Sequence, residues 1–303
     1  HVNDHFDTEL EVDFDMGFDA ARSLHDAFPF IRRFHGHTAV IKYGGSAMEG
    51  EELPERITAD IALLKYLGLK PVVVHGGGPA ITAMLKRVGH ASSFQRGLRV
   101  TDPETMEITE MVLSGQVNKD LVQRLCRHEA PAVGVSGKDA RLFTAEKRLH
   151  DGTDLGRVGR ITEVRIELIR SLADAGYIPV IAPVSAAPDG TTYNINADEA
   201  AVEIAAALAA EKLLFLTDVA GILKDPSDPE SLIADMNVQS ARTALEDGTI
   251  SGGMIPKTEA ALSALERGAG AVHIIDGTLR HALLLEIFTE KGIGTLITKE
   301  HEQ

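Results

Sequence analysis

A lysine and two glycine clusters at the ends of apolar runs are the residues of this sequence best suited to chemistry. Lys42 lies inside the run AVIKY, which Gly44 and Gly45 follow at once, and a second run, VVVH, is followed by Gly76 to Gly78. A lysine in a buried strand is costly unless an anion meets it. Glycines just past a strand let the backbone approach a ligand closely. The pattern therefore predicts a cradle for phosphate groups.

Three well-known glycine motifs do not fit these loops. VGVSGKD (133–139) is similar to a Walker A loop, but Ala132 stands at its first glycine position and Asp139 stands where Ser or Thr would bind magnesium. HGGG can form the oxyanion hole of an esterase, but the chain has no G-x-S-x-G elbow. In a dinucleotide-binding loop the last glycine would fall on Ile81. Taken alone, each loop is equally compatible with a structural glycine turn.

Composition restricts the class of protein. The chain has 303 residues, a formal net charge of −15 and one cysteine, Cys126. A single cysteine excludes an internal disulfide and a cysteine-based zinc site, and the negative charge argues against nucleic acid as a partner. The sequence has no apolar stretch of membrane-spanning length and no signal-peptide pattern. We therefore expect a cytoplasmic protein that binds neither nucleic acid nor a membrane, and the spacing of its histidines predicts no protein-built metal site.

Alternating apolar and amphipathic segments indicate the fold class. From residue 38 onward, strand-like runs such as TAVIKY and KPVVVH alternate with helical patterns such as PERITADIALLKYLG. Continuously apolar strands separated by helices are typical of a mainly parallel sheet covered on both faces. Ligands of such α/β sheets bind at the carboxyl ends of the strands, which is where the glycine loops are expected.

Five motifs in a fixed order are more specific than any one of them. They are Lys42 with Gly44 and Gly45, the glycines at 76–78, NINAD (194–198), TDVAGIL (217–223) and SGGMIPK (251–257). In this order, residues 38–298 resemble the amino-acid kinase family, and within it the members that phosphorylate N-acetyl-L-glutamate. The resemblance implies a three-layer αβα sandwich around a mainly parallel open sheet of about eight strands, with an extra N-terminal helix. It also implies a lobe over 37–190 that binds acetylglutamate and a lobe over 191–303 that binds ATP.

The reaction implied by the resemblance is transfer of the γ-phosphoryl group of ATP to the side-chain carboxylate of N-acetyl-L-glutamate, an early step of arginine biosynthesis. That carboxylate has a reference pKa of about 4.3 and is already ionised at neutral pH, so no general base is required. The protein must bring two anions together and stabilise charge on the transferred group. ATP chemistry also implies Mg²⁺, held mostly by phosphate oxygens and water.

The resemblance assigns a role to each polar residue of the motifs. Lys42 and Lys257 would flank the phosphoryl group, and Asp198 would hold both lysines. Arg99 would bind the substrate α-carboxylate with its planar fork, and Asn194 would form a hydrogen bond with the substrate. Each has a plainer alternative: a strand-end lysine for Lys42, a helix N-cap for Asp198 and an exposed loop arginine for Arg99.

Backbone groups of the glycine loops and of two further motifs complete the implied site. For TDVAGIL and TISGG the plainer alternative is an ordinary turn at the end of a strand. The substrate would contact Gly76 and Gly77. The residues assigned to the nucleotide are Gly44, Gly45, Thr217, Asp218, Gly221, Ile222, Leu223, Ile250, Ser251 and Gly252.

The two ends of the chain resemble the arginine-inhibited members of the family. Residues 1–17 contain six acidic residues and no Lys or Arg, and we expect a disordered tail there. Residues 18–36 have apolar side chains three to four positions apart, which predicts an amphipathic helix. The resemblance implies that such helices from neighbouring dimers interlace into a hexamer, while the plainer alternative is that the stripe packs on its own subunit.

The segments VHIID (272–276) and HALLLEIFTEKGIGTLI (281–297) match the arginine site of those members. This implies L-arginine as an inhibitor, and the carboxylate of Glu286 suits a guanidinium group. Phe30 stands where an aromatic residue with a hydroxyl is expected, and the missing hydrogen bond would weaken arginine binding. The residues assigned to the site are Lys212, His273, Glu286 and Gly292.

Two other functions remain open from the sequence. A pocket one methylene longer discriminates only modestly, so the substrate could be a related acylated amino acid such as acetylaminoadipate. A catalytically silent ligand-sensing protein on the same fold is the second alternative, although both lysines and Asp198 are present.

Overall fold

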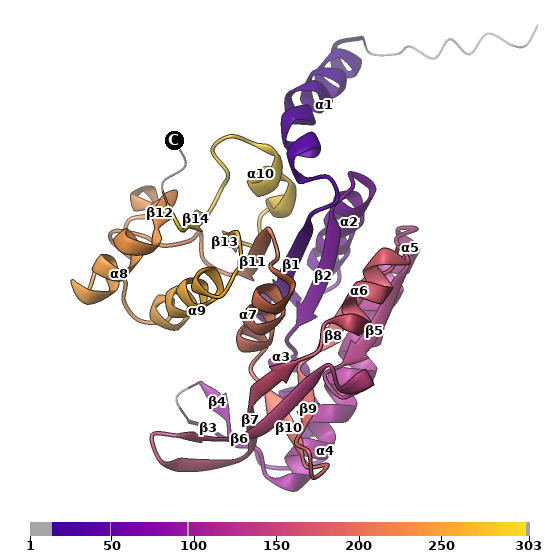
Figure 1. Cartoon of the computed structure of the whole chain (residues 1–303), viewed down its shortest axis with the longest axis vertical. Coiled ribbons are helices and arrows are strands. Elements are labelled where there is room, and N and C mark those ends of the chain that lie inside the picture. The colour runs from indigo at the N-terminus through magenta and orange to yellow at the C-terminus, as the bar shows by residue number, and fades with distance from the viewer. Residues whose placement is uncertain (1–13, 49, 96, 301–303) are drawn as a thin grey trace, which may run out of the picture.

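The computed structural model describes residues 14–48, 50–95 and 97–300 (Figure 1). The expected acidic tail over 1–17 falls mostly on residues 1–13, which lie outside the described residues. Its last four positions belong instead to helix α1 (Phe14–Phe34), which begins earlier than expected and extends away from the body of the molecule (Figure 1).

The main sheet has eight strands in the order β12-β14-β13-β11-β1-β2-β8-β5. All neighbouring strands are parallel except the pair β13 and β14. The predicted α/β class with a mainly parallel sheet of about eight strands is therefore confirmed. The strands are β1 (Thr38–Tyr43), β2 (Lys70–His75), β5 (Ala132–Ser136), β8 (Ile178–Ala182), β11 (Lys212–Thr217), β12 (Asp235–Asn237), β13 (Ala271–Asp276) and β14 (Thr295–Thr298).

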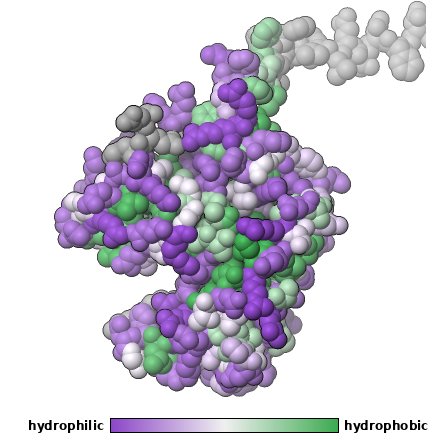
Figure 2. Space-filling model, in the orientation of Figure 1, coloured by the Kyte–Doolittle hydropathy of each residue, from purple (hydrophilic) through white to green (hydrophobic). Residues whose placement is uncertain are grey.

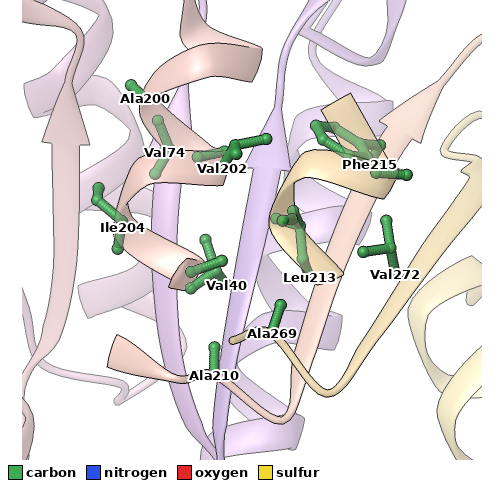
Figure 3. Close-up of a cluster of buried hydrophobic side chains, with 14 of the residues drawn as sticks. Val40, Val74, Ala200, Val202, Ile204, Ala210, Leu213, Phe215, Ala269 and Val272 are labelled. Carbon is green, nitrogen blue, oxygen red and sulfur yellow. The ribbon is translucent and has the colours of Figure 1, made fainter. Parts of the chain in front are cut away.

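Helices cover both faces of the sheet. Alternate residues of one strand enter different hydrophobic clusters. Val40 belongs to a cluster that includes residues of α7, α8 and α9, whereas Ile41 belongs to one that includes residues of α2, α5 and α10. Figure 3 shows Val202 and Ile204 of α7 beside Val40 on the first face. Burial on both faces explains why the strands are continuously apolar. The helices are α2 (Glu52–Tyr66), α3 (Gly78–Arg87), α4 (Pro103–Glu110), α5 (Asn118–Arg127), α6 (Glu167–Asp174), α7 (Ala197–Leu208), α8 (Val238–Glu246), α9 (Met254–Glu266) and α10 (Ala282–Phe288).

Short helical turns connect several of these elements. One of them is a π-helix that joins α4 directly to α5. The turns are η1 (Gly45–Met48), the π-helix η2 (Met111–Val117), η3 (Asp139–Arg141) and η4 (Pro229–Ser231).

A second group of strands lies beyond the carboxyl end of β2 (Figure 1). Four of them close into a small barrel in the order β10-β7-β6-β9, and two form a separate hairpin. Strand β10 pairs with β7 and β9, so the barrel continues past the lobe boundary expected at 190. These strands are β3 (Phe94–Gln95), β4 (Leu98–Arg99), β6 (Phe143–His150), β7 (Thr153–Val164), β9 (Val184–Ala186) and β10 (Thr192–Ile195).

Within the described ranges, the helices are too short or too polar for any of them to cross a lipid bilayer.

Candidate active site

Three charged side chains from three separate elements meet beyond the carboxyl end of β1. Lys42 is the penultimate residue of β1, Asp198 lies in the first turn of α7, and Lys257 lies in the first turn of α9. The Nζ atom of Lys42 is 2.9 Å from Oδ1 of Asp198, and the Nζ atom of Lys257 is 3.4 Å from Oδ2. One carboxylate thus bridges two ammonium groups. We call these three residues the lysine cluster.

The lysine cluster carries an excess of positive charge. Burial alone would raise the pKa of Asp198, but the two lysines more than offset this effect and hold its pKa below the ordinary value. The carboxylate is therefore ionised at neutral pH, and two cations face one anion. Both lysine side chains keep some exposure, 13% for Lys42 and 23% for Lys257. An additional anion can therefore reach them.

The N-cap of α7 is Asn196, and this corrects the helix-cap alternative for Asp198. The side chain of Asn196 accepts hydrogen bonds from the backbone N–H groups of Asp198 and Glu199, at 2.9 and 3.1 Å. The N-terminal amides of the helix are thus satisfied by a neutral residue. The carboxylate of Asp198 remains free to contact the lysines.

The two glycine loops lie against each other beside Lys42. A Cβ atom at Gly44 would lie 3.2 Å from Nζ of Lys42 and 3.4 Å from the backbone nitrogen of Gly76. Gly45 has φ of +64°, a conformation that favours glycine. The N–H of Gly76 donates to the carbonyl of Tyr43 at 2.8 Å. This bond continues the hydrogen-bond ladder between the central strands β1 and β2. Contrary to the expectation, the N–H of Gly76 is therefore not available to phosphate or substrate.

A pocket adjoins the lysine cluster on the side of the small barrel. The loop 76–78 forms one wall, and Arg99 and Asn194 contribute polar side chains. Figure 2 shows that the surface is hollowed between the region of α9 and the β3–β4 hairpin. The apolar side chains that line the pocket are Ile81, Phe94, Leu98, Leu113, Val158 and Ile195.

Arg99 is a buried cation at the wall of this pocket, which contradicts the alternative of an exposed loop arginine. Its side chain donates to Gly78 O at 3.0 Å, to Thr82 Oγ1 at 2.8 Å and to the hydroxyl of Ser92. The guanidinium also lies over the ring of Phe94, 4.5 Å from its centre. Burial lowers its pKa. No carboxylate within the described residues forms an ion pair with it, so an anionic ligand would compensate the buried charge.

Apart from Gly44 and Gly45, the residues assigned to the nucleotide are either packed in the interior or placed at the ends of strands and loops. Ile222 and Ile250 are buried in the core, so only their backbone could contact a ligand. Gly221 packs against β14, where a Cβ would lie 2.6 Å from Oγ1 of Thr295. The remaining residues lie at strand and loop ends: Thr217 and Asp218 at the end of β11, Leu223 in a bridge to Leu232, and Ser251 and Gly252 just before α9.

The residues assigned to arginine meet in a second place. Lys212 begins β11 and His273 lies in β13, with 3.0 Å between Nζ of Lys212 and Nε2 of His273. Nδ1 of His273 lies 2.7 Å from Oε1 of Glu286. We call these three residues the histidine cluster. With Gly292 they line a cavity of about 730 Å³ that also includes Phe30 of α1.

Glu286 is buried in the histidine cluster and its hydrogen bonds are extensive. Burial would raise its pKa, but the bond from His273 and two backbone N–H groups more than offset this and lower it. The backbone donors are Ile293 at 2.7 Å and Gly294 at 3.0 Å, both to Oε2. An ionised carboxylate is thus held at one end of the cavity.

No group of three or more His, Cys, Asp or Glu side chains within the described residues is arranged to hold a metal ion.

The residues beneath the glycine loop were missed by the sequence reasoning. His75 is the last residue of β2 and is fully buried, and Asn118 begins α5 and is 1% exposed. Leu113 of the π-helix packs under Gly77, where a Cβ would lie 2.5 Å from its Cδ2. The only signal in the sequence was a polar residue, His75, at the end of an otherwise apolar run.

Comparison with curated proteins gives long and closely similar relatives. The acetylglutamate kinase of Caldanaerobacter subterraneus subsp. tengcongensis is 54% identical, over 92% of this chain and 93% of that protein. The acetylglutamate kinase of Synechococcus elongatus is 52% identical, over 92% of both proteins.

Solved structures share the fold over most of the chain. N-acetylglutamate synthase from Neisseria gonorrhoeae, in complex with coenzyme A and N-acetyl-glutamate, is 31% identical with a TM-score of 0.82. The same enzyme in complex with coenzyme A and L-arginine is 30% identical with a TM-score of 0.77. The matches cover 93% and 92% of this chain but only 64% and 65% of the synthase chains. This chain therefore spans less than two thirds of their length.

A more distant structure, carbamate kinase from Giardia lamblia bound to AMP-PNP, shows the fold alone at 20% identity and a TM-score of 0.63, over 88% of this chain and 99% of that one. The model of the amino acid kinase family matches residues 37–276, which include the lysine cluster and both glycine loops. The chain belongs to the amino acid kinase family.

Proposed function

We propose that this protein transfers the γ-phosphoryl group of ATP to the side-chain carboxylate of N-acetyl-L-glutamate. One observation carries the proposal: a cluster with excess positive charge adjoins a pocket in which the buried Arg99 has no carboxylate partner within the described residues. The cluster suits the transferred phosphoryl group and the pocket suits an acidic amino acid. The names of the most similar curated relatives support the same substrate.

The reaction needs charge stabilisation and positioning. Lys42 and Lys257 reach the space in front of Asp198 from two different elements, so they can contact two sides of one phosphoryl group. Charge that develops on its oxygens during transfer would be stabilised by both ammonium groups. Asp198 positions the lysines and keeps them from repelling each other. The nucleophilic carboxylate is ionised at neutral pH, with a reference pKa of about 4.3.

The substrate would bind with its α-carboxylate on Arg99 and its acyl group among the apolar residues of the pocket. Asn194 lines the same pocket and can donate to the amide oxygen or a carboxylate. This arrangement directs the side-chain carboxylate toward the lysine cluster. Mg²⁺ would enter with ATP and be held by phosphate oxygens and water, since Asp198 is already occupied by two lysines.

A coupled ATP-turnover assay tests the proposal with acetylglutamate, glutamate, aspartate and acetylaminoadipate as acceptors. We expect the highest kcat/KM with acetylglutamate. A higher kcat/KM with acetylaminoadipate would show that the substrate is a longer acylated amino acid. No turnover with any acceptor would contradict the kinase proposal and favour a ligand-sensing role.

We further propose that L-arginine inhibits the enzyme by binding in the cavity of the histidine cluster. The ionised Glu286 offers a partner for a guanidinium group, and the cavity volume of about 730 Å³ is typical of small-molecule sites. The related synthase has a structure in complex with L-arginine. The cavity is closed on one side by Phe30 and Phe34 of α1, so the same ligand would contact the N-terminal helix.

The exposed apolar residues of α1 support a hexamer built through this helix. Phe18, Leu24 and Phe28 are 74%, 63% and 57% exposed, and the helix extends away from its own subunit (Figure 1). The alternative in which the whole stripe packs on its own subunit is thus wrong for these three residues. We propose that a second copy of α1 covers them.

Light scattering for mass and activity against rising L-arginine test both proposals. We expect a hexamer whose activity falls at millimolar arginine. A dimer that ignores arginine would contradict the regulatory proposal without affecting the kinase proposal.

A further inference from the structure

The glycine loop beside the substrate pocket is held from below by a buried histidine. Nδ1 of His75 lies 2.7 Å from the carbonyl oxygen of Gly76, and its Nε2 lies 3.1 Å from Nδ2 of Asn118. Neither residue reaches the lysine cluster or appears among the residues that line the pocket. Two buried polar side chains at this position therefore need a purpose other than substrate contact.

The orientation of the Asn118 side chain follows from its partners. Nδ2 lies 3.0 Å from the carbonyl of Val180, which can only accept a hydrogen bond, and Oδ1 lies 3.0 Å from Nζ of Lys119, which can only donate. The NH₂ group of Asn118 must therefore face His75, whose Nε2 accepts. The proton of the neutral ring is thus on Nδ1, and Nδ1 donates to the carbonyl of Gly76.

The surrounding structure is shaped to keep this arrangement. A Cβ atom at Gly134 of β5 would lie 1.8 Å from Oδ1 of Asn118, so the close approach requires a glycine there. Lys119 also donates to the carbonyl of Gly134 at 3.0 Å. The π-helix ends directly before Asn118, and such helices are frequent at functional sites. Asn118 of α5 thereby joins His75 of β2 to the backbone of β8, and Lys119 joins α5 to the backbone of β5.

Burial keeps the ring in its neutral form. It lowers the pKa of His75 to about 4, and the charge of Lys119 acts in the same direction against the opposing effect of the Gly76 carbonyl. A neutral ring can keep one nitrogen as an acceptor for Asn118, which a protonated ring could not do.

The consequence for the pocket follows from the planar trans peptide. Because the carbonyl of Gly76 points to His75, the N–H of Gly77 points to the opposite side of the same peptide. Gly77 lines the pocket, and within the described residues no protein acceptor is bonded to its N–H. Leu113 fills the space under Gly77 and limits movement of the loop.

We propose that His75, Asn118 and Lys119 form a positioning relay that orients the Gly76–Gly77 peptide so that the N–H of Gly77 stabilises charge on the group being transferred. The proposal rests on the proposed kinase function. None of the three residues touches the substrate, so they are positioning residues. Lys119 and the carbonyl of Val180 orient Asn118. Asn118 and the carbonyl of Gly76 together fix the tautomer of His75, and His75 in turn holds the Gly76–Gly77 peptide.

Two substitutions of His75 test the roles of its two ring nitrogens separately. The amide nitrogen of asparagine lies as many bonds from the backbone as Nδ1, and that of glutamine lies as many as Nε2. In His75→Asn the bond to Gly76 can be kept, and we expect kcat within about threefold of the wild type. In His75→Gln that bond is lost, and we expect kcat to fall by at least about tenfold with the KM for ATP unchanged.

Lys119→Met tests the far end of the relay, with the exposed Lys86→Met of α3 as the matched control. Without its lysine the Asn118 amide loses one of the two contacts that orient it and keeps the bond to the carbonyl of Val180. In the fraction of molecules in which the amide rotates, its oxygen would favour a proton on Nε2 of His75. ¹⁵N-histidine-labelled protein, assigned with His75→Asn, should show the Nδ1–H tautomer in the wild type and in Lys86→Met. It should show an increased Nε2–H fraction in Lys119→Met, together with a lower kcat.

Several outcomes would overturn the relay. An equal loss of kcat in His75→Asn and His75→Gln that follows loss of thermal stability would reduce His75 to a packing residue. An Nε2–H tautomer in the wild type would also contradict the relay, as would an unchanged tautomer and kcat in Lys119→Met. If the His75 variants do not fold, the result for Lys119→Met decides, because Lys119 is exposed. A wild type without turnover but with the Nδ1–H tautomer would contradict the kinase function and the catalytic role of the relay, while leaving its hydrogen bonding intact.

Discussion

The lysine cluster and the histidine cluster combine the same types of charge at opposite ends of one sheet. Lys42 lies near the carboxyl end of β1, whereas Lys212 opens β11 at the amino end of the neighbouring strand. In the first cluster two ammonium groups share one carboxylate, which leaves an excess positive charge. In the second, one lysine and one carboxylate are joined through a histidine.

The chemistry of His273 makes the second cluster neutral. Lys212 can only donate, so Nε2 of His273 must accept and Nδ1 donates to Glu286. The charges of Lys212 and Glu286 then balance. The side chains of His273 and Glu286 are each only 3% exposed, whereas all three side chains of the lysine cluster are partly open. The open cluster suits a passing phosphoryl group, and the closed one suits a ligand that is held without reaction.

The spaces beside the two clusters differ in volume, and the closed cluster adjoins the larger one. The pocket at Arg99 encloses about 170 Å³ and the cavity at Glu286 about 730 Å³. The wider cavity is lined by α1 as well as by the sheet, so its ligand can affect how the N-terminal helix is placed.

The largest expected effect comes from removing one cation of the lysine cluster. We expect Lys257→Ala to lower kcat by about 10²- to 10³-fold, because the ammonium acts on charge that develops in the transition state. The KM for acetylglutamate should change little. Steady-state kinetics would check this, and a variant with near-normal kcat would remove Lys257 from the mechanism and erase the contrast between the clusters.

Glu286→Gln tests the closed cluster. Only one oxygen would remain where three donors converge, and an NH₂ group would oppose at least one of them, so we expect a loss of about 1–3 kcal/mol in the free energy of unfolding. Arginine inhibition should weaken while kcat without arginine stays close to that of the wild type. Chemical denaturation and inhibition curves measure both. Wild-type stability together with unchanged arginine inhibition would show that the carboxylate of Glu286 neither stabilises the fold nor binds arginine.

Arg99→Lys tests whether the narrow pocket binds a carboxylate. An ammonium cannot reproduce bidentate binding, and it cannot keep all the bonds to Gly78, Thr82 and Ser92. We expect the KM for acetylglutamate to rise by about tenfold, or about 1.4 kcal/mol, with little change for ATP. A change confined to the KM for ATP would place Arg99 on the nucleotide side.

The smallest expected effect is a pH dependence of stability. The pKa values of Glu286 and Asp198 are lowered in the folded state, so each contributes stability that is fully present above its unfolded value of about 4. That contribution is lost as pH falls through the folded pKa. The stability difference between the wild type and Glu286→Gln should therefore be largest near neutral pH and shrink below about pH 4. A difference that grows on acidification would contradict the sign.

Much of the fold and the location of the site followed from the sequence. Continuously apolar strands, and glycines directly after two of them, reflect local requirements: burial on both faces and close backbone approach. These requirements act on neighbouring residues, so they are visible without a structure. The resemblance to the amino-acid kinase family, which the motif order carries, implied that Lys42, Asp198 and Lys257 lie together, and the structure places them within hydrogen-bonding distance.

Tertiary structure decided which polar groups remain free. The N–H of Gly76 is bonded to Tyr43, and Asn196 rather than Asp198 caps α7. The first outcome depends on an acceptor in the neighbouring strand, which spacing along the chain does not reveal. The second is local, because Asn196 accepts from N–H groups two and three residues ahead, and it depends on the residue at which α7 begins. The start of α1 at Phe14 and the closed barrel were also not predicted from the motifs. The first depends on how far the helix propagates and the second on which strands pair.

His75 and Asn118, which lie beneath the glycine loop, show most clearly what the sequence determines and what only the tertiary structure decides. The sequence by itself determined that a glycine loop follows β2, because a ligand at the end of a strand needs close backbone approach. Only the fold brings Asn118, 43 positions away, against His75. The carbonyls of Gly76 and Val180, together with Lys119, then fix which nitrogen of the ring carries the proton. Hydrogen-bond direction is a property of the assembled neighbours, so the orientation of the loop was decided by tertiary structure alone.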